Sequence, residues 1–288
     1  MTPVINLNDG TTIPQLGFGT LNVPENRSGS EQATEITAEA VRQAIAAGYR
    51  HVDTAQMYGN EAGVGRGVAT AGVPRSDIHI TSKLSNANHR PQDVRRSFDE
   101  TLRKLRTDQL DLFLMHWPLP MLYDGDYPST WQAITGLKAD GRLRSAGVSN
   151  FQPDHLDRII RETGTRPAVN QIEVHPYFRN DAARHASQQH DIAVEAWSPL
   201  GQGTVLKDEV IERIAAGHGK TTAQVILRWH VQHGHIIFPK SARPERMTEN
   251  IRIFDFALAD EDMAVIDGLD RGEDGRIGPN PDKFDWVP

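Results

Sequence analysis

The feature that most limits the fold of this chain is a repeat, in which a short apolar run is followed by a turn and a segment with helical spacing. Eight such runs follow one another within 288 residues, at 16–19, 50–53, 78–82, 110–115, 143–148, 168–170, 192–196 and 236–238. Strands that alternate with helices predict βαβ units and a parallel sheet. Eight repeats in a chain of this length favour an α/β fold with a closed (β/α)8 TIM barrel. An open doubly wound sheet is the alternative that the pattern leaves.

Turn and helix signals support the same alternation. Asn8-Asp9-Gly10 separates two short apolar runs, and Asp-Gly at such a position predicts an N-terminal β-hairpin. Pro91 suits the first turn of a helix, and Gly48 and Gly141 suit helix ends. No low-complexity tract or linker divides the sequence, so we expect residues 1–288 to form a single domain. Apolar residues recur at helical spacing within 36–45, 94–105, 131–137, 156–160 and 225–229.

Composition excludes several classes of protein. With 31 basic and 38 acidic residues the formal net charge is −7, which argues against a nucleic-acid partner. The chain has no cysteine, so disulfides, thiolate nucleophiles and cysteine-based metal sites are excluded. Its most apolar uncharged stretch, 112–123, is shorter than the roughly 18 residues of a membrane-spanning helix. Met1-Thr2-Pro3 begins no secretion signal. We therefore expect a cytoplasmic protein that has no membrane partner.

Polar side chains lie at or just after the ends of the predicted strands. Asp53, Lys83 and His116 end three consecutive runs, and Tyr58 follows soon after the first of them. In a parallel barrel all such positions open on one face, where the active site lies. A barrel built only for its core would have no reason to place an acid, an amine and an imidazole there.

These four side chains together suit the protonation of an oxygen atom. A tyrosine with an unperturbed pKa of about 10 is a poor proton donor at neutral pH. An adjacent ammonium favours the phenolate and lowers that pKa, and a carboxylate would anchor the ammonium. The histidine could orient a carbonyl group or donate to its oxygen. Because the set contains no metal cluster and no activated serine, the source of hydride is expected to be a nicotinamide cofactor.

Several short blocks of sequence lie at the predicted strand ends and in the turns that follow them. They are 48–55 (GYRHVDTA), 58–61 (YGNE), 110–112 (LDL) with 115–118 (MHWP), 147–151 (GVSNF), 169–173 (VNQIE) and 239–241 (PKS). These blocks resemble the aldo-keto reductase family, and they occur in that family's order over essentially the whole chain. Within the family, Asp274-Gly275-Arg276 and Gly278-Pro279 are similar to the bacterial 2,5-diketo-D-gluconate reductase-like branch.

The resemblance implies NADPH-dependent reduction of small-molecule aldehydes or ketones, such as diketones, keto sugars or keto acids, by a monomer. In the family's scheme Tyr58 is the general acid, Lys83 and Asp53 tune it, and His116 orients the carbonyl group. Ser149, Asn150 and Gln171 would bind the carboxamide of the cofactor, and Trp197 would stack on the nicotinamide ring. The other cofactor residues that the resemblance implies are Thr20; Ser198, Leu200 and Gly201 along the pyrophosphate; Lys240, Ser241, Arg243 and Arg246 around the 2′-phosphate; and Glu249 and Asn250 on the adenine.

Two positions of the expected substrate pocket depart from the family's pattern. Leu21 stands where an aromatic residue is usual, and Ser85 stands where tryptophan is usual. Trp117 is then the main aromatic wall that remains. We therefore expect a wider or more polar mouth than is common in the family.

Other interpretations of these residues stay open. The four polar side chains could be a buried polar network that only supports the barrel rim. The chain could also be a non-catalytic, NADP(H)-binding regulatory barrel. His51 and Asp53 share a strand face and could belong to a metal-dependent hydrolase, although no further ligand set is visible. We expect no metal site at His230, His233 and His235, because they span a helix end and a strand start and should diverge. The glycines within 63–67 do not complete a dinucleotide fingerprint.

Overall fold

A closed barrel of parallel strands forms the centre of the molecule, in a computed structural model that describes residues 2–24 and 29–288. Leu16 pairs with Ile237, and the Gly17 amide donates to the Ile237 carbonyl oxygen at 2.9 Å, which closes the sheet. The predicted (β/α)8 fold is confirmed, and all of its predicted strands are present. In sheet order they are β3 (Phe18–Gly19), β4 (His51–Asp53), β5 (His79–Leu84), β6 (Leu110–Met115), β7 (Leu143–Ser149), β8 (Val169–Glu173), β9 (Ala193–Trp197) and β10 (Ile236–Ile237).

The predicted hairpin is present and covers the amino-terminal end of the barrel. It consists of the antiparallel strands β1 (Val4–Asn6) and β2 (Thr12–Pro14). The Asn8 side chain donates to the carbonyl oxygens of Pro167 and Asp191, which precede β8 and β9. Ile13 packs with barrel residues such as Leu112. The carboxyl ends of the strands, where the polar residues gather, are left for the site.

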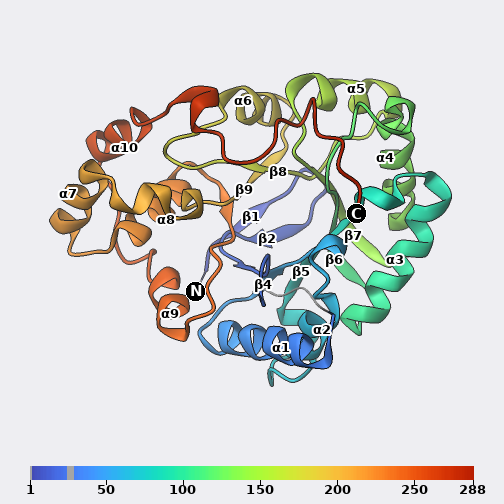
Figure 1. Cartoon of the computed structure of the whole chain (residues 1–288), viewed down its shortest axis with the longest axis horizontal. Coiled ribbons are helices and arrows are strands. Elements are labelled where there is room, and N and C mark those ends of the chain that lie inside the picture. Colours follow the sequence, from blue (N-terminus) through green and yellow to red (C-terminus); the bar gives the residue numbers. More distant parts are fainter. Residues whose placement is uncertain (1, 25–28) are drawn as a thin grey trace.

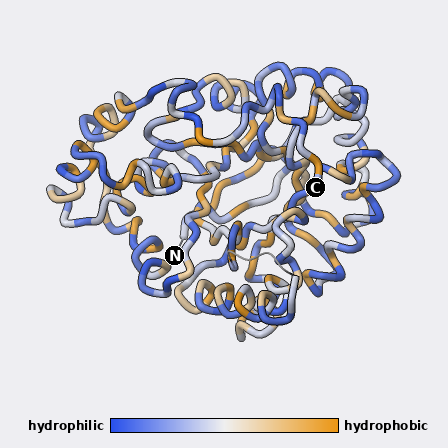
Figure 2. The backbone as a smooth tube through the Cα atoms, viewed as in Figure 1, coloured by the Kyte–Doolittle hydropathy of each residue, from blue (hydrophilic) through white to orange (hydrophobic). Residues whose placement is uncertain are grey.

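Helices form a ring around the barrel (Figure 1). Apolar residues gather in the central strands and on the inner sides of the helices (Figure 2). Pro91 is the first residue of its helix, as predicted. None of the described helices has the length and apolar character needed to cross a membrane. The helices are α1 (Glu31–Ala46), α2 (Glu61–Ala69), α3 (Pro91–Leu105), α4 (Tyr127–Gly136), α5 (Pro153–Thr163), α6 (Asp181–Gln189), α7 (Glu209–His218), α8 (Thr222–Gln232), α9 (Pro244–Ile251) and α10 (Asp260–Asp267).

Close packing between α1 and α2 explains the glycines of α2. A Cβ atom on Gly63 would lie 2.5 Å from Thr37 Cβ, and one on Gly67 would lie 2.7 Å from the Ala38 carbonyl oxygen. Both distances are too short for real contacts, so only glycine lets the two helix backbones approach this closely. The glycines within 63–67 therefore allow α1 and α2 to pack closely.

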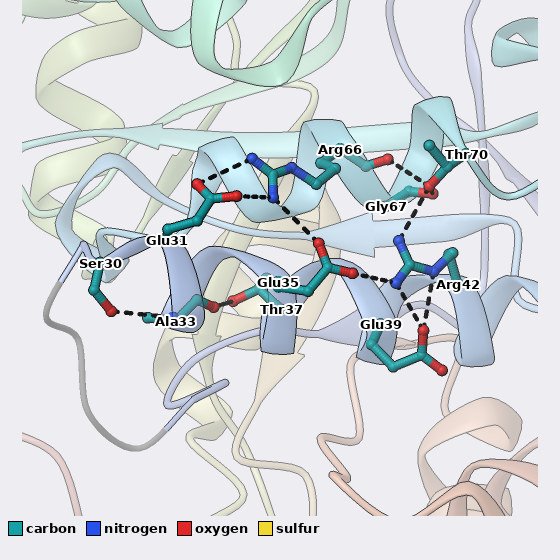
Figure 3. A network of polar contacts seen from close by, with 10 residues as sticks. All are labelled: Ser30, Glu31, Ala33, Glu35, Thr37, Glu39, Arg42, Arg66, Gly67 and Thr70. Carbon is teal, nitrogen blue, oxygen red and sulfur yellow. Dashed lines mark hydrogen bonds and ion pairs between the residues drawn. The ribbon is translucent and has the colours of Figure 1, made fainter.

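Ion pairs join the same two helices on their exposed side (Figure 3). Glu35 of α1 accepts from Arg42 of its own helix at 2.6 Å and from Arg66 of α2 at 3.1 Å. Glu35 is 52% exposed, and solvent weakens such pairs. The glycine contacts, rather than these charges, set the distance between the helices.

His230, His233 and His235 were expected to diverge, and this prediction is wrong for His230 and His235. His230 Nδ1 lies 3.0 Å from His235 Nδ1, because the turn at Gly234 brings the start of β10 back along α8. His230 Nε2 also contacts the Pro199 carbonyl oxygen, and His233 turns away to Asp267. Burial lowers the pKa of His230 to about 3, so this pair stays neutral and serves internal hydrogen bonding.

We expect Gly67→Ala to lower the free energy of unfolding by about 1–3 kcal/mol, because the added methyl group forces α2 away from α1. The matched control is Gly217→Ala in α7, where a Cβ atom would meet nothing within 4 Å. It should raise the free energy of unfolding by about 0.5–1 kcal/mol. Urea denaturation measures both values, and equal effects at the two positions would contradict the packing account.

Candidate active site

The carboxyl ends of β4, β5 and β6 bring three of the predicted site residues together. Asp53 is the last residue of β4, and His116 directly follows β6. Lys83 was expected just after its strand, but β5 continues to Leu84, so Lys83 is held inside the sheet. Tyr58 ends the 3-10 turn Gln56–Tyr58 that follows β4. Strand register therefore fixes the acid and the amine, while a short turn presents the phenol.

Lys83 is the centre of the cluster. Its side chain is fully buried, and its Nζ lies 2.8 and 2.7 Å from the two carboxylate oxygens of Asp53. The same ammonium donates to the Thr54 carbonyl oxygen at 2.9 Å and to Tyr58 Oη at 3.3 Å. A buried charge is tolerated only when it is paired and hydrogen-bonded, and these four contacts meet that condition.

Electrostatics keep this amine charged. Burial alone would lower the pKa of Lys83, but the charge of Asp53, together with Tyr58, outweighs burial and raises that pKa above its usual value. The Tyr58 phenol therefore faces a permanent positive charge at neutral pH.

The His116 imidazole faces the phenol. Its ring centroid lies 5.9 Å from that of Tyr58, with the two planes at 72°. Burial, followed by the nearby charge of Lys83, holds the pKa of His116 well below its usual range. His116 is therefore a neutral imidazole with one N–H to donate. Its Nδ1 atom is buried and has no hydrogen-bond partner among the described residues.

The residues expected at the nicotinamide end form one connected group. Asn150 follows β7 with a φ of 65°, and its amide nitrogen donates to the His116 carbonyl oxygen at 2.9 Å. Trp197 Nε1 donates to Asn150 Oδ1 at 2.9 Å, and Ser149 Oγ donates to the Gln171 carbonyl oxygen at 2.8 Å. Hydroxyl and amide groups of this kind fit a carboxamide, and the indole beside them offers a flat face. The donor set therefore suits a nicotinamide.

The residues expected along the rest of the cofactor separate into two kinds. Lys240, Arg243 and Arg246 are exposed, and none of the three forms an ion pair within the described part of the chain. Arg243 caps α9, and Ser241 Oγ accepts from the Arg243 amide at 3.0 Å. Three unpaired cations at a helix N-terminus fit a phosphate group.

The other residues predicted to bind the cofactor either form hydrogen bonds within the protein or lie in a loop with positive φ angles. Ser198 and Gly201 have φ values of 49° and 53°, which shape the loop after β9 around Leu200. Thr20 Oγ1 donates to the Asp53 carbonyl oxygen at 2.8 Å. Glu249 accepts from Thr221, the residue that caps α8, at 2.7 Å, and the neighbouring Asn250 is buried.

The predicted substrate residues differ in their surroundings. Leu21 is 41% exposed at the rim, whereas Ser85 is buried and its Oγ accepts from the Ala87 amide to start a short turn. Trp117 is buried against Phe284 of the C-terminal tail, with ring centroids 4.1 Å apart. Nothing in the sequence pattern singled out Phe284, because it lies in a segment without periodicity.

The tail crosses the strand ends (red in Figure 1) and is tied down at both sides. Buried Glu173, at the end of β8, accepts from the amides of Ile277 and Gly278 at 2.6 and 2.9 Å. At the far side, the Asn86 side chain donates to the Trp286 carbonyl oxygen at 2.8 Å. The tail therefore forms one wall of the mouth above the buried cluster.

His51 does not support the metal-dependent alternative. One ring nitrogen lies 3.2 Å from the Pro14 carbonyl oxygen and the other 2.9 Å from Thr81 Oγ1. Both nitrogens are thus engaged at the end of the barrel that the hairpin covers. Over residues 2–24 and 29–288, no group of three or more His, Asp or Glu side chains could hold a metal ion.

Residues 15–271 match the Aldo/keto reductase family. The chain belongs to this family. It is 46% identical over 287 residues to an aldo-keto reductase of Mycolicibacterium smegmatis, with 100% of each chain covered. It is 43% identical to the glyoxal reductase of Bacillus subtilis, with 97% of this chain and 96% of that one covered. Membership makes the chain an NADP-dependent oxidoreductase that acts on carbonyl compounds.

Solved structures agree with this assignment. The apo structure of Gox0644 superposes with a TM-score of 0.92 at 44% identity, covering 99% of this chain and 100% of that one. An aspartate-to-alanine mutant of Gox0644, in complex with NADPH, gives a TM-score of 0.91 at 43% identity, with the same shares covered.

We expect Lys83→Met to lower the free energy of unfolding by about 3–5 kcal/mol, because it leaves the Asp53 carboxylate buried without its cation. Adding Asp53→Leu to the same chain removes the unpaired charge and should restore most of that loss. Urea denaturation compares the two variants. If the double variant were as unstable as the single one, the ion pair would not be the source of the loss.

Proposed function

We propose that this barrel reduces the carbonyl groups of small molecules to alcohols, with NADPH as the hydride donor and Tyr58 as the acid that protonates the oxygen. The observation that carries the proposal is the placement of one buried ammonium, Lys83, against both the Asp53 carboxylate and the Tyr58 hydroxyl. Membership of the aldo-keto reductase family supports the reaction class.

Each side chain has a distinct part in the proposed reaction. When bound, NADPH supplies a hydride to the carbonyl carbon. The neutral His116 imidazole donates a hydrogen bond to the carbonyl oxygen and orients it. As negative charge develops on that oxygen, Tyr58 gives up its proton, so the carbon gains a hydride and the oxygen gains a proton. Lys83 stabilises the phenolate that is left, and solvent reprotonates it after the alcohol leaves.

The cofactor residues follow from the same proposal. Ser149, Asn150 and Gln171 would hold the carboxamide, and Trp197 would lie against the ring. Asn150 Oδ1 accepts from Trp197 Nε1 in this structure, so a hydrogen bond holds the indole beside the amide. The unpaired Lys240, Arg243 and Arg246 would bind the 2′-phosphate, with Ser198, Leu200 and Gly201 along the pyrophosphate. Thr20, Ser241, Glu249 and Asn250 would complete the site.

The substrates that we propose are small dicarbonyl compounds, keto sugars and keto acids. The similarity to a glyoxal reductase supports a small dicarbonyl substrate. Leu21, Ser85 and Trp117 would line the substrate side of the mouth, with Phe284 of the tail behind Trp117. We further propose that residues 1–288 act as one domain, as a monomer and in the cytoplasm.

We expect Tyr58→Phe to lower kcat by about 10²–10⁴-fold, because the variant lacks the general acid. NADPH affinity, measured by fluorescence titration, should stay unchanged. Tyr49→Phe is the matched control, since Tyr49 is a buried tyrosine outside the proposed site whose hydroxyl donates to the Met247 carbonyl oxygen at 3.2 Å. Steady-state oxidation of NADPH with a panel of aldehydes and diketones measures kcat.

If Tyr58→Phe retained wild-type turnover, the proton-donor assignment would be wrong. A wild-type protein that bound NADPH but reduced nothing in the panel would instead favour a regulatory barrel.

We expect Arg246→Ala to weaken NADPH binding by about 10–100-fold, because it removes a charged hydrogen bond to the 2′-phosphate. NADH lacks that phosphate, so its binding should not change. Arg213→Ala, an exposed arginine of α7, is the control for a general loss of positive charge. Dissociation constants for both cofactors test this expectation, and equal catalytic efficiency of the wild type with NADH and NADPH would refute it.

A further inference from the structure

A second carboxyl group lies inside the barrel below the proposed site. Glu195 is in the middle of β9, and its side chain has no exposed surface. Side chains two residues apart in a strand share a face, so Glu195 lies one layer below Trp197. In the sheet it pairs with Gln171 of β8 and with Ile236 of β10.

Gln171 joins this carboxyl group to the proposed catalytic cluster. Its amide nitrogen donates to Glu195 Oε2 at 2.8 Å and to Asp53 Oδ2 at 3.0 Å. Both donor positions of the amide are therefore used. The amide oxygen of Gln171 is the group left to accept from the cofactor's carboxamide.

Glu195 has no cation of its own. Its Oε1 has no hydrogen-bond partner, and the carboxyl group forms no ion pair with any residue that the structure describes. The charged groups that face it are Asp53 from β4 and Lys83 from β5, and Lys83 is held by both oxygens of Asp53. The neighbours on β8 and β10, Gln171 and Ile236, carry no charge.

Charge balance in the barrel therefore favours the protonated form of this group. Burial, and next the negative charge of Asp53, raise the pKa of Glu195 to about 8, although Gln171 and Lys83 oppose the shift. Below that pH the group formed by Asp53, Lys83 and Glu195 contains one carboxylate and one ammonium.

We propose that Glu195 works as a neutral carboxylic acid that positions Gln171 between itself and Asp53, and that its ionisation sets the alkaline limit of carbonyl reduction. The second half of this inference rests on the proposed function. As a neutral acceptor, Glu195 holds the Gln171 amide without adding charge. When it ionises, a second negative charge offsets that of Lys83, so the Tyr58 phenolate is less favoured and the proton is released less readily. Reduction should then fall as the pH rises through about 8.

Infrared titration tests the protonation state without depending on the reaction. The spectrum of the wild type minus that of Glu195→Gln should contain the C=O stretch of a carboxylic acid at pH 6.5. That band should give way to carboxylate bands as the pH is raised to 9.5. A difference spectrum with carboxylate bands alone at pH 6.5 would overturn the proposal, whatever the enzyme's activity.

Kinetics test the consequence for reduction. Glu195→Gln imitates the neutral acid, so it should keep kcat/KM near the wild-type value at pH 6.5. A single group with a pKa of about 8 leaves about a tenth of the wild-type protein in the protonated form at pH 9. The ratio of variant to wild-type kcat/KM should therefore rise about tenfold between pH 6.5 and pH 9. A ratio that stays constant with pH would overturn the proposed alkaline limit.

Two further variants separate charge, position and folding. Glu61→Gln is the matched control: Glu61 is a buried carboxyl group with a raised pKa, but it bonds to Ser82, which points away from the barrel interior. Its pH profile should match the wild type. Glu195→Met is also neutral but cannot accept from Gln171, so it should raise KM for NADPH and show the alkaline behaviour of Glu195→Gln. An unchanged KM for NADPH in Glu195→Met would overturn the positioning role.

Discussion

The rest of this structure depends on the need to stabilise one fully buried ammonium group, that of Lys83. Lys83 is stable in the barrel only because Asp53 offers both carboxylate oxygens and Thr54 offers a carbonyl group. Those partners come from β4 and the segment after it, so the charge ties two neighbouring strands together at their carboxyl ends. Thr20, from the segment after β3, then holds the Asp53 backbone with its amide and its hydroxyl.

The two ends of the barrel cover the buried Lys83 charge in different ways. At the amino-terminal end the hairpin fills the opening with apolar side chains such as Ile13, and the Pro14 carbonyl oxygen contacts the His51 ring. At the carboxyl end the tail covers only part of the opening, because Glu173 holds it along one side. The Lys83 charge is therefore buried, whereas Tyr58, the proposed proton donor that contacts it, is partly exposed.

Much of the barrel could be predicted from apolar periodicity, because the buried positions of strands and amphipathic helices recur at regular spacing in the sequence. Helix α6 gave no such signal, since it buries small residues such as Ala183 and Ser187. The histidine pair at His230 and His235 was misjudged because a tight turn, which spacing does not reveal, brings the two together. The sequence does hint at Glu195, because it is a charged residue within the apolar run 192–196. No feature of the sequence indicates that Phe284 packs on Trp117.

The central claim is that the buried Lys83 ammonium makes the Tyr58 phenol easier to ionise. Ultraviolet titration tests it most directly, with Tyr58 isolated as the difference between each protein and its Tyr58→Phe variant. The comparison is made with Lys83 present and with Lys83→Met. The account predicts that the midpoint of the Tyr58 titration moves to higher pH when the ammonium is removed. A midpoint that stays in place would contradict it.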